Sequence, residues 1–409
     1  MSWKTIRLGD CCTKIGSGAT PKGGAVGYID TGVTFIRSHN VYNLHFDDDR
    51  LTHVTDDAAK KLNGVTVFEG DVLLNITGDS VARTCVVPRG ILPARVNQHV
   101  AIIRPDTKIL DNRFLNYYLA SPYMQAFMLG LAVGKGASRN AMTKDMIANY
   151  EVPCPSIETQ RCIADILSSY DNLIENNQKQ IKLLEEAAQR LYKEWFVDLR
   201  FPGYEDSKIV DGVPEGWSKG RADAFFNITI GKTPPRAEHE WFTKKNDGIP
   251  WVSIADMGNS TSHLFETKES LTHDAIKRHN IKVVPAGTVL LSFKLTVGRV
   301  SITTSDMCTN EAIAHFYMPD DYFQGYTYCY LKNFHYDELG STSSISKAVN
   351  SKIIKSMPFI MPTEDLLKEF SKIVSPIFDM AKNKAKTVIM TQQARDRLLP
   401  KLMNGEIEV

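Results

Sequence analysis

The sequence predicts an α+β protein made of two strand-rich globular domains, each followed by one long helix. Three observations support this prediction: the chain repeats itself once, each half contains short β-branched runs, and each half ends in a heptad pattern. The 409 residues are enough for two or three domains of about 150 residues each. With 43% apolar and 23% charged residues, the composition is typical of a folded globular protein.

Six short motifs of the first half recur in the same order in the second half. The matched segments are Met1–Gly9 with Pro214–Arg221, Gly18–Pro21 with Gly231–Pro234, Gly32–Ser38 with Gly248–Ile254, Leu51–His53 with Leu271–His273, Gly70–Leu74 with Gly287–Leu291, and Asn97–Ala101 with Asn310–Ala314. One such match would arise by chance, whereas six in one order indicate an internal duplication. Trp3 and Trp217 match across the repeats, and we expect both to anchor a core.

The first part of each half is predicted to be rich in strands. Its β-branched runs are separated by Gly, Pro, Asn and Asp, which is typical of short strands joined by turns. The expected strands are Val33–Ile36, Val72–Ile76, Val100–Ile103, Val289–Phe293 and Val300–Thr303. The proline-bounded segments Val152–Pro155 and Phe359–Pro362 end these parts. We therefore expect domains at 1–155 and 201–362, and helices within 156–200 and 363–409.

The second part of each half carries a seven-residue hydrophobic repeat. Steps of four and three residues run without a break from Ile163 to Trp195, and nine of these ten positions are apolar. The equivalent positions from Phe370 to Leu402 are apolar in seven of ten cases. This repeat is typical of a coiled-coil seam, with an ordinary core helix as the alternative. The interior Pro376 weakens the seam of the second helix, because an interior proline kinks or breaks the repeat. The expected pairing residues include Ile174, Ile181, Leu184, Leu191, Trp195, Val388, Leu398 and Leu402.

Composition and termini exclude several classes of protein. The seven cysteines form no C-x-x-C pair, which argues against both a disulfide framework and a zinc site. The N-terminus lacks the apolar core of a signal peptide, and the longest apolar run, Ala126–Gly134, is too short to cross a bilayer. We therefore expect a cytoplasmic protein that is not associated with a membrane. The net charge of +1 leaves nucleic-acid binding open, because local patches rather than totals attract phosphate.

Motifs that resemble catalytic sites are incomplete. Gly231-Lys-Thr233 has the end of a phosphate-binding loop, but the glycine required earlier in that loop is Phe226. Asp256, Glu266 and Lys268 resemble the carboxylates and lysine that hold Mg²⁺ in nucleases, but the first repeat has no such set. The histidines show no metal-binding spacing. We therefore predict a chain without a catalytic site or bound metal, and a nuclease using Asp256, Glu266 and Lys268 remains the alternative.

Several ordered motifs together resemble a known family. They are Trp3 with Leu8-Gly-Asp10, Gly-x-Thr-Pro in each half, Gly78-Asp-Ser-Val-Ala-Arg83, Pro153-x-Pro155 with Gln160 and Ile163, Trp195-Phe-Val-Asp198, and Gln393 to Gly405 with an internal Leu-Leu-Pro-Lys-Leu. This order resembles the specificity subunit of type I restriction–modification systems over nearly the whole chain. One departure is that Leu367 stands where the first helix has Gln160.

The resemblance implies a division of labour. Each strand-rich domain would be a target-recognition domain that reads half of a split double-stranded DNA sequence. The helices would pair as an antiparallel coiled coil with pseudo-two-fold symmetry, set the unread gap and help to dock two methyltransferase subunits. Restriction (motor) subunits would join this core in a bacterial or archaeal cell. S-adenosylmethionine, Mg²⁺ and ATP would be bound by those partners and not by this chain.

Candidate DNA contacts follow from side-chain chemistry rather than from the resemblance. Bases are read by Arg, Lys, Asn and Ser side chains, and phosphates are held by Arg, Lys and backbone amides near glycines. The candidates follow predicted strands or lie in glycine- and serine-rich loops. They are Lys22, Arg37, Ser38, Asn40, Arg83, Lys135, Arg139 and Asn140 in the first half, and Arg236, Lys294, Arg299, Ser344 and Lys347 in the second. A structural scaffold that binds no DNA is a third hypothesis beside the reader and the nuclease.

Overall fold

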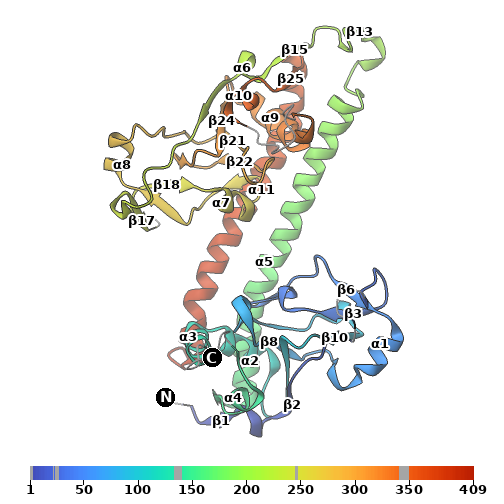
Figure 1. The fold of residues 1–409 in the computed structure, drawn as a ribbon, viewed down its shortest axis with the longest axis vertical. Coiled ribbons are helices and arrows are strands. Elements are labelled where there is room, and N and C mark those ends of the chain that lie inside the picture. Colours follow the sequence, from blue (N-terminus) through green and yellow to red (C-terminus); the bar gives the residue numbers. More distant parts are fainter. Residues whose placement is uncertain (1–2, 22, 24–26, 133–140, 245–246, 340–349) are drawn as a thin grey trace. The chain divides into compact units, whose positions relative to one another are not determined.

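The chain forms two compact units, each combining one strand-rich region with parts of both long helices. Unit 1 comprises residues 1–174 and 390–409, and unit 2 comprises residues 175–389. The computed structural model describes residues 3–21, 23, 27–132, 141–244, 247–339 and 350–409 (Figure 1). Within these residues, none of the helices has the length and apolar content needed to span a bilayer.

The strand-rich part of unit 1 contains two four-stranded sheets. One has the order β2-β11-β8-β9 and the other the order β6-β3-β10-β7. The strands are β1 (Thr5–Arg7), β2 (Cys12–Ser17), β3 (Val33–Ile36), β4 (Val41–Tyr42), β5 (His45–Phe46), β6 (Thr52–Val54), β7 (Thr66–Val67), β8 (Val72–Asn75), β9 (Thr84–Val86), β10 (Ala94–Val96), β11 (Val100–Pro105) and β12 (Glu151–Pro153). The shorter helices are α1 (Asp56–Lys61), α2 (Asn112–Ala120), α3 (Pro122–Ala132) and α4 (Lys144–Ala148).

Unit 2 repeats this plan. Its larger sheet has the order β16-β24-β21-β22-β19 and its second sheet the order β17-β20-β18-β23. The strands are β13 (Ile209–Val210), β14 (Val213–Pro214), β15 (Ser218–Arg221), β16 (Asn227–Ile230), β17 (Phe242–Lys244), β18 (Ile249–Val252), β19 (His263–Leu264), β20 (Glu269–Leu271), β21 (Val289–Ser292), β22 (Val300–Thr303), β23 (Cys308–Thr309), β24 (Ile313–Tyr317) and β25 (Pro358–Met361). The shorter helices are α6 (Ala222–Phe225), α7 (Ile254–Asn259), α8 (His273–Arg278), α9 (Tyr322–Asn333) and α10 (Ser351–Lys355).

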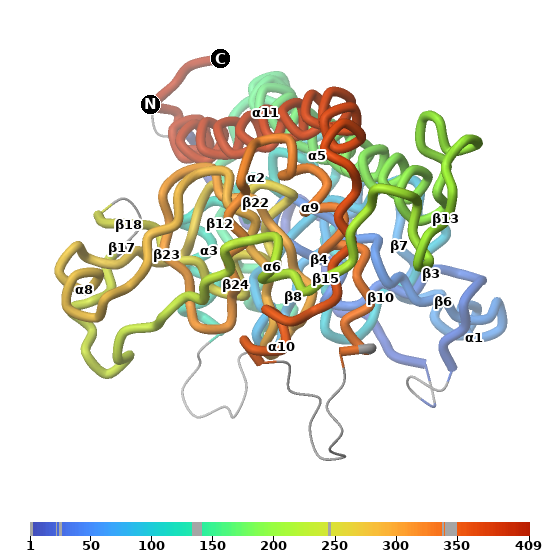
Figure 2. Tube along the Cα trace, turned by 90° about the horizontal axis from the view of Figure 1, so that it is seen from above, coloured from blue at the N-terminus to red at the C-terminus, as the bar shows by residue number. Residues whose placement is uncertain are grey.

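The predicted duplication is confirmed in detail. The parallel pair β3–β10 of unit 1 has its equivalent in the parallel pair β18–β23 of unit 2. Helices α1 and α8, capped by Thr55 and Thr272, lie beside the equivalent sheets in the views of Figure 1 and Figure 2. The matched glycines Gly70 and Gly287 precede β8 and β21 with φ of +83° and +84°, a left-handed conformation that favours glycine. All five predicted strands are present; two have the predicted ends, and three differ at one end by one or two residues.

The proline-bounded segments contain strands that close each strand-rich part. In unit 1, β12 pairs antiparallel with β1, and in unit 2 β25 pairs antiparallel with β15. The beginning and the end of each strand-rich part are therefore held together just before the long helix begins. Trp3 packs against the first core near Phe114, and Trp217 packs against the second core near Phe196, as expected for core anchors.

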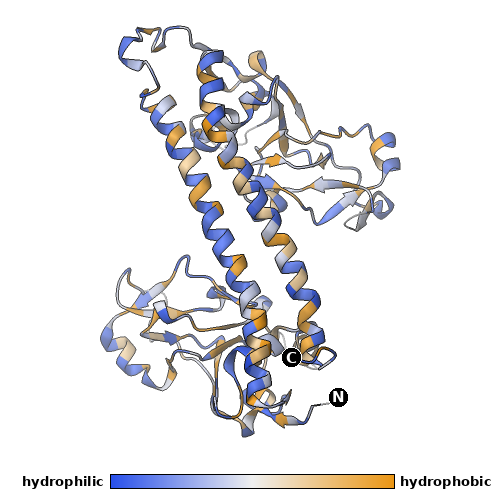
Figure 3. Cartoon of the chain, turned by 180° about the vertical axis from the view of Figure 1, so that it is seen from behind, coloured by the Kyte–Doolittle hydropathy of each residue, from blue (hydrophilic) through white to orange (hydrophobic). Residues whose placement is uncertain are grey.

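Two long helices follow the strand-rich parts. The first, α5, spans Ile157–Tyr192 and continues as a π-helical turn over Lys193–Val197, and the second, α11, spans Glu364–Met403. Apolar and polar residues alternate along both helices (Figure 3). Pro376 does not interrupt the predicted second helix, because α11 continues through it. Pro376 itself is exposed, and the buried Val374 and Phe378 continue the apolar stripe on either side of it.

The heptad positions form the least exposed stripe of each helix. Among the pairing candidates, Ile174, Ile181, Trp195, Val388 and Leu402 are buried. Leu191 and Leu398 are half-buried and pack against the cores of unit 2 and unit 1 respectively. Leu184 is also only half-buried, so full burial of Leu184 and Leu191 is a wrong expectation. In unit 1, Ile163 and Leu167 of α5 share a core with Leu399 and Leu402 of α11. In unit 2, the ring of Trp195 lies 5.8 Å from that of Phe370.

A buried histidine gives unit 2 an acid-sensitive core. The imidazole of His315 is fully buried and bonds the hydroxyls of Thr229 at 2.8 Å and Thr309 at 2.6 Å. Burial, helped by the charge of Lys282, lowers the pKa of His315 to about 3. The unfolded chain takes up this proton near pH 6.5. Stability from the neutral imidazole is therefore complete above about pH 6.5 and is lost as the pH falls toward 3.

We expect the titration of His315 to lower the free energy of unfolding by about 2 kcal/mol when the pH falls from 7 to 5. The His315→Gln variant lacks this titration, so its unfolding free energy should fall by about 2 kcal/mol less than that of the wild type over the same interval. Urea unfolding at both pH values measures the difference. A gap between the two proteins that is the same at pH 7 and pH 5 would contradict the prediction.

Candidate functional site

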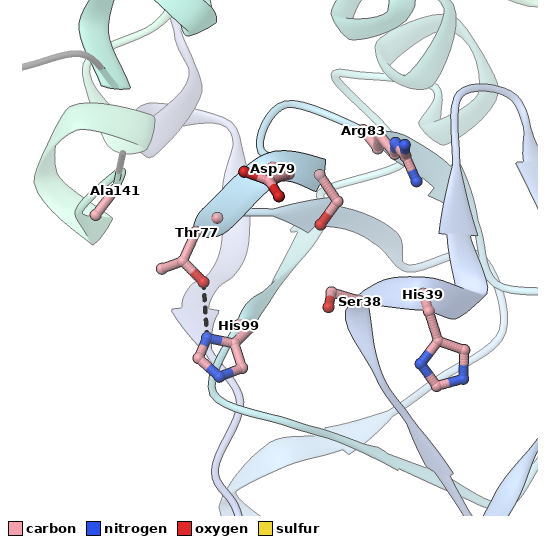
Figure 4. A pocket seen from close by; sticks show the side chains of 9 residues that line it. Ser38, His39, Thr77, Asp79, Arg83, His99 and Ala141 are labelled. Atoms are coloured by element: carbon pink, nitrogen blue, oxygen red, sulfur yellow. Dashed lines mark hydrogen bonds between the residues drawn. The ribbon is translucent and has the colours of Figure 1, made fainter. Parts of the chain in front are cut away.

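A polar pocket of about 550 Å³ opens in unit 1 where three turns meet (Figure 4). The turns follow β3, join β8 to β9 and join β10 to β11, and Ala141 closes the pocket from outside these sheets. Its lining consists of Ser38, His39, Thr77, Gly78, Asp79, Ser80, Arg83, His99 and Ala141. Hydroxyl, imidazole, carboxylate and guanidinium groups therefore surround one concave surface, which suits a ligand with several hydrogen-bonding groups.

Backbone geometry and one side-chain bond shape this pocket. Thr77 and the ring of His99 are joined by a 2.7 Å hydrogen bond between Oγ1 and Nδ1. Thr77 also bridges to Ala141. Gly78 and Ala82 have φ of +75° and +73°, which turn the chain sharply between β8 and β9. Arg83 leaves this turn as the first residue after Ala82.

The guanidinium of Arg83 lies stacked on an aromatic ring at the edge of the pocket. Its Cζ lies 4.6 Å from the centre of the Tyr42 ring, and the side chain is half-buried. Within the described residues, this guanidinium has neither an ion pair nor a hydrogen bond. Stacking holds the planar group in place and leaves its five N–H donors available to a ligand.

Of the three candidate DNA contacts in the segment after β3, two lie at or beside the pocket and the third is buried. Ser38 lines the pocket, and Arg37 lies beside it with Nη2 3.4 Å from Nε2 of His39. Burial and the charge of Arg37 lower the pKa of His39. Asn40 is wrong as a DNA contact, because it is fully buried and braces the turn. Its Oδ1 accepts from the Arg37 amide, and its Nδ2 donates to the carbonyl of Asp47.

Unit 2 uses the equivalent arginine differently. Arg299 follows Gly298, whose φ of +89° matches that of Ala82. Instead of stacking on a ring, Arg299 donates from Nη1 to the carbonyl of Ile254 at 2.5 Å. It also covers Gly258, where a β-carbon would lie 2.3 Å from Nη1. Arg299 therefore links the turn after β21 to helix α7. It also lines a smaller pocket of about 250 Å³ with Glu185, Ser260, Thr261 and Lys332.

The other two described candidates of unit 2, unlike Arg299, are exposed and lie over aromatic rings. Arg236 is exposed, forms an ion pair with Glu269 at 2.9 Å and stacks over Phe242 and Trp251. Lys294 is exposed on the turn after β21, with Nζ 5.7 Å from the ring centre of Phe293. Six candidates lie outside the described residues: Lys22, Lys135, Arg139, Asn140, Ser344 and Lys347. In the sequence, Lys135, Arg139 and Asn140 precede Ala141 of the pocket.

The nuclease motif serves a structural purpose. Asp256 is the third residue of α7, and its Oδ2 accepts hydrogen bonds from the amide and hydroxyl of Ser253. Its Oδ1 accepts from the amide of Lys268. Asp256 stands where unit 1 has Asn40, so both residues cap the turn after the equivalent strand. Among the residues that the structure describes, only the half-buried Asp47 and the exposed Asp48 and Asp49 bring three metal-ligand atoms within 4.8 Å.

Sequence reasoning missed five polar members of the unit 1 pocket. Thr77, Asp79, Ser80 and His99 line it with Arg83, and His39 lies between the candidates Ser38 and Asn40. The motif Gly78 to Arg83 was a usable signal, because a polar turn with two positive φ angles presents several side chains at once. His99 had no such signal, since only the tertiary contact of two hairpins brings it to Thr77.

Comparisons with known proteins agree over almost the whole chain. The family model described as type I restriction modification DNA specificity domain matches residues 1–186 and 214–389. The chain is 25% identical to the type I restriction enzyme HindI specificity subunit of Haemophilus influenzae, with 99% of each protein covered. It is 25% identical to the type I restriction enzyme MjaIX specificity subunit of Methanocaldococcus jannaschii, with 87% of this chain and 82% of that relative covered. The solved structure of a type I restriction–modification system S subunit from M. genitalium matches with a TM-score of 0.59 and 14% identity, covering 98% of this chain and 96% of that one.

Proposed function

The chain belongs to the type I restriction modification DNA specificity family, and we propose that it reads a split DNA target, one half with each unit. The observation that carries this proposal is the duplication: two copies of one framework place an arginine at the same turn, as Arg83 and Arg299. Two readers in one chain suit a target with two separate halves. The reading itself requires no catalytic residue in this chain.

In unit 1, the pocket and its rim supply both kinds of DNA contact. Arg83 stacks on Tyr42 at the edge of the pocket and, unlike Arg299, donates to no backbone carbonyl of the described residues, so its guanidinium suits the phosphate backbone. His39, Asp79 and His99 are not shared, because the duplication has Ala255 for His39 and Ala312 for His99. A carboxylate such as Asp79 accepts a hydrogen bond from the amino group of cytosine. These unshared side chains are our candidates for reading bases, together with Ser38.

The remaining basic candidates complete the proposed DNA surface. Arg37 lies beside the pocket, and Lys135, Arg139 and Asn140 precede Ala141 in the chain. In unit 2, we propose Lys294 and Arg236 as DNA contacts and Arg299 as a residue that positions the turn carrying Lys294. Lys22, Ser344 and Lys347 stay candidates on the strength of their charge and polar surroundings in the sequence.

We further propose that α5 and α11 pair as an antiparallel coiled coil. Two contacts support this: the start of α5 shares a core with the end of α11 in unit 1, and the end of α5 contacts the start of α11 in unit 2. The paired helices would set the gap between the two half-sites and help to dock two methyltransferase subunits, with restriction subunits joining them. S-adenosylmethionine, Mg²⁺ and ATP would then be bound by those partners and not by this chain.

One experiment tests the central proposal. The chain is expressed with its methyltransferase partner, and methylated adenines in the host genome are mapped. We expect methylation at a sequence of two short halves separated by a constant gap. Methylation confined to a continuous site would overturn the split-target proposal, and gel-shift titration without any site preference would favour the scaffold hypothesis.

Arg83→Ala should weaken DNA binding about equally for all sequences. A phosphate contact releases one counterion, so the slope of log affinity against log salt should fall by about one unit. Arg89→Ala is the matched control, because Arg89 is an exposed arginine of the same unit that lies 3.8 Å from Glu69. It should leave the slope unchanged. A loss confined to one base position would instead identify Arg83 as a base reader.

A further inference from the structure

A half-buried ion pair joins the two long helices within unit 1. Arg395 of α11 donates from Nη1 to Oδ1 of Asp171 in α5 across 2.6 Å, and the side chains are 15% and 23% exposed. Tyr117 of α2 donates its hydroxyl to the other oxygen of the same carboxylate. The carboxylate is therefore held both by the facing helix and by the globular part of its own unit.

Unit 2 has apolar residues at the equivalent helix positions. The heptad offset of 207 places Phe378 where unit 1 has Asp171, and Ala188 where unit 1 has Arg395. Phe378 is 4% exposed and its ring lies 5.1 Å from that of Tyr328, while Ala188 is fully buried. The two helix positions that are charged in unit 1 are therefore apolar and buried in unit 2.

The globular contact differs in the same way. Asn112 of α2 donates to the carbonyl of Gly70, and Gln324 of α9 donates to the carbonyl of the matched Gly287, each at 2.9 Å. These bonds align α2 with α9 and make Cys329 the counterpart of Tyr117. Cys329 is fully buried, and its sulfur lies 4.0 Å from the carbonyl oxygen of Ala188.

This difference matters because each helix resembles the other closely enough to pair with a second copy of itself. If two α5 helices paired in the same geometry, each Asp171 would face Ala188 of the other copy. If two α11 helices paired, each Arg395 would face Phe378. Either arrangement buries a charge against an apolar side chain, which is strongly unfavourable. Pairing of α5 with α11 gives Asp171 its cationic partner and gives Arg395 a carboxylate on the facing helix, in addition to the exposed Asp396 beside it.

We propose that the Asp171–Arg395 pair selects pairing between the two different helices and excludes pairing of like helices from two copies of the chain. This inference rests on the proposed pairing of α5 with α11. A half-buried ion pair adds little net stability compared with apolar residues, but losing one partner leaves an uncompensated charge. A single polar contact in an apolar seam is an established way to specify partner and register.

Light scattering of the full-length chain tests this proposal. Asp171→Leu combined with Arg395→Leu makes the seam of unit 1 as apolar as that of unit 2. We expect the melting temperature to stay the same or rise, and a dimer to form whose fraction increases with protein concentration. Asp171→Leu alone should lower the melting temperature by about 5 °C or more, because Arg395 loses its partner on the facing helix and keeps only the exposed Asp396. The exchanged pair, Asp171→Arg with Arg395→Asp, should keep the molar mass of the wild type.

Two further variants keep the outcome clear. Glu364→Leu with Lys368→Leu removes an ion pair on the exposed face of α11, where the side chains are 62% and 47% exposed, and should not cause dimers. Asp171→Asn with Arg395→Gln removes both charges without adding apolar surface and should also form dimers. If both charge-free seam variants keep the molar mass of the wild type, the proposal is wrong. The measurement uses no DNA, so this result would leave the split-target proposal untouched.

Discussion

Gly18→Ala should unfold the strand-rich part of unit 1 locally and abolish reading of one half-site. A β-carbon at Gly18 would lie 2.2 Å from the carbonyl oxygens of both Val96 and Asn97. These carbonyls belong to backbone that cannot move aside, because Ala19 bonds Val96 and Gly18 bonds Val100. We expect a loss of about 3 kcal/mol or more for such overpacking. The displaced segment carries His99 of the pocket, so recognition by unit 1 should fail with it.

Hydrogen exchange resolved by residue measures this effect. Amides of β8 and β11 should exchange faster in the variant, while those of β21 and β24 in unit 2 should keep their protection. Gly16→Ala is the control, since a β-carbon at Gly16 has nothing within 4 Å. Gly231→Ala should speed exchange in β21 and β24 and leave β8 and β11 protected, because a β-carbon at Gly231 would lie 2.0 Å from Oγ1 of Thr309. Equal protection losses in both units would contradict independent folding of the two readers.

Exchanging residues 1–155 for the equivalent segment of a related specificity subunit should change one half of the target completely. The other half and the gap should stay the same, because they depend on unit 2 and on the helices. Contacts in well-separated sites usually contribute independently. Mapping methylated adenines before and after the exchange measures both halves and the gap together.

The structure decides where this exchange must be made. A junction after residue 150 separates β1 from β12, whereas a junction after residue 155 transfers the complete pair. The chimera joined after residue 150 is therefore a control of lower expected stability. The transferred segment must also keep Arg113 and Tyr117, which bond Asp165 and Asp171 of α5. A chimera that changed both halves, or the gap, would show that the readers form one inseparable surface.

Most of the fold could be predicted because its signals are local and repeated. In a heptad repeat, every third or fourth residue is apolar, which marks a long helix in the sequence. The helices α5 and α11 begin within one residue of the predicted 156 and 363. The duplication doubled the evidence for every strand. Pro376 weakens the repeat in the sequence but does not break the helix, because it lies on the exposed face of α11 and Val374 and Phe378 on either side are buried.

The candidate site could be predicted only in part. Arg83, Arg37 and Ser38 gather at or beside one pocket, as their positions after strands suggested. Asn40 and Asp256 looked chemically active but cap turns, and the pattern Ser253-x-x-Asp256 is a capping box that the sequence already contains. The matched arginines Arg83 and Arg299 make different contacts, one with a ring and one with a backbone carbonyl, and no local sequence pattern distinguishes them.

By itself, the sequence determined the duplication, the strand-rich and helical parts, and the family to which the chain belongs. These follow from periodicity and motif order, which depend on near neighbours along the chain. Only the tertiary structure decided which polar residues meet. Arg83 stacks on Tyr42, whereas Arg299 reaches the carbonyl of Ile254, and Asp171 meets Arg395 across a separation of 224 residues. The reason is that the environment of a charged side chain is set by residues distant in the sequence, through burial and hydrogen bonds that only the packed chain creates.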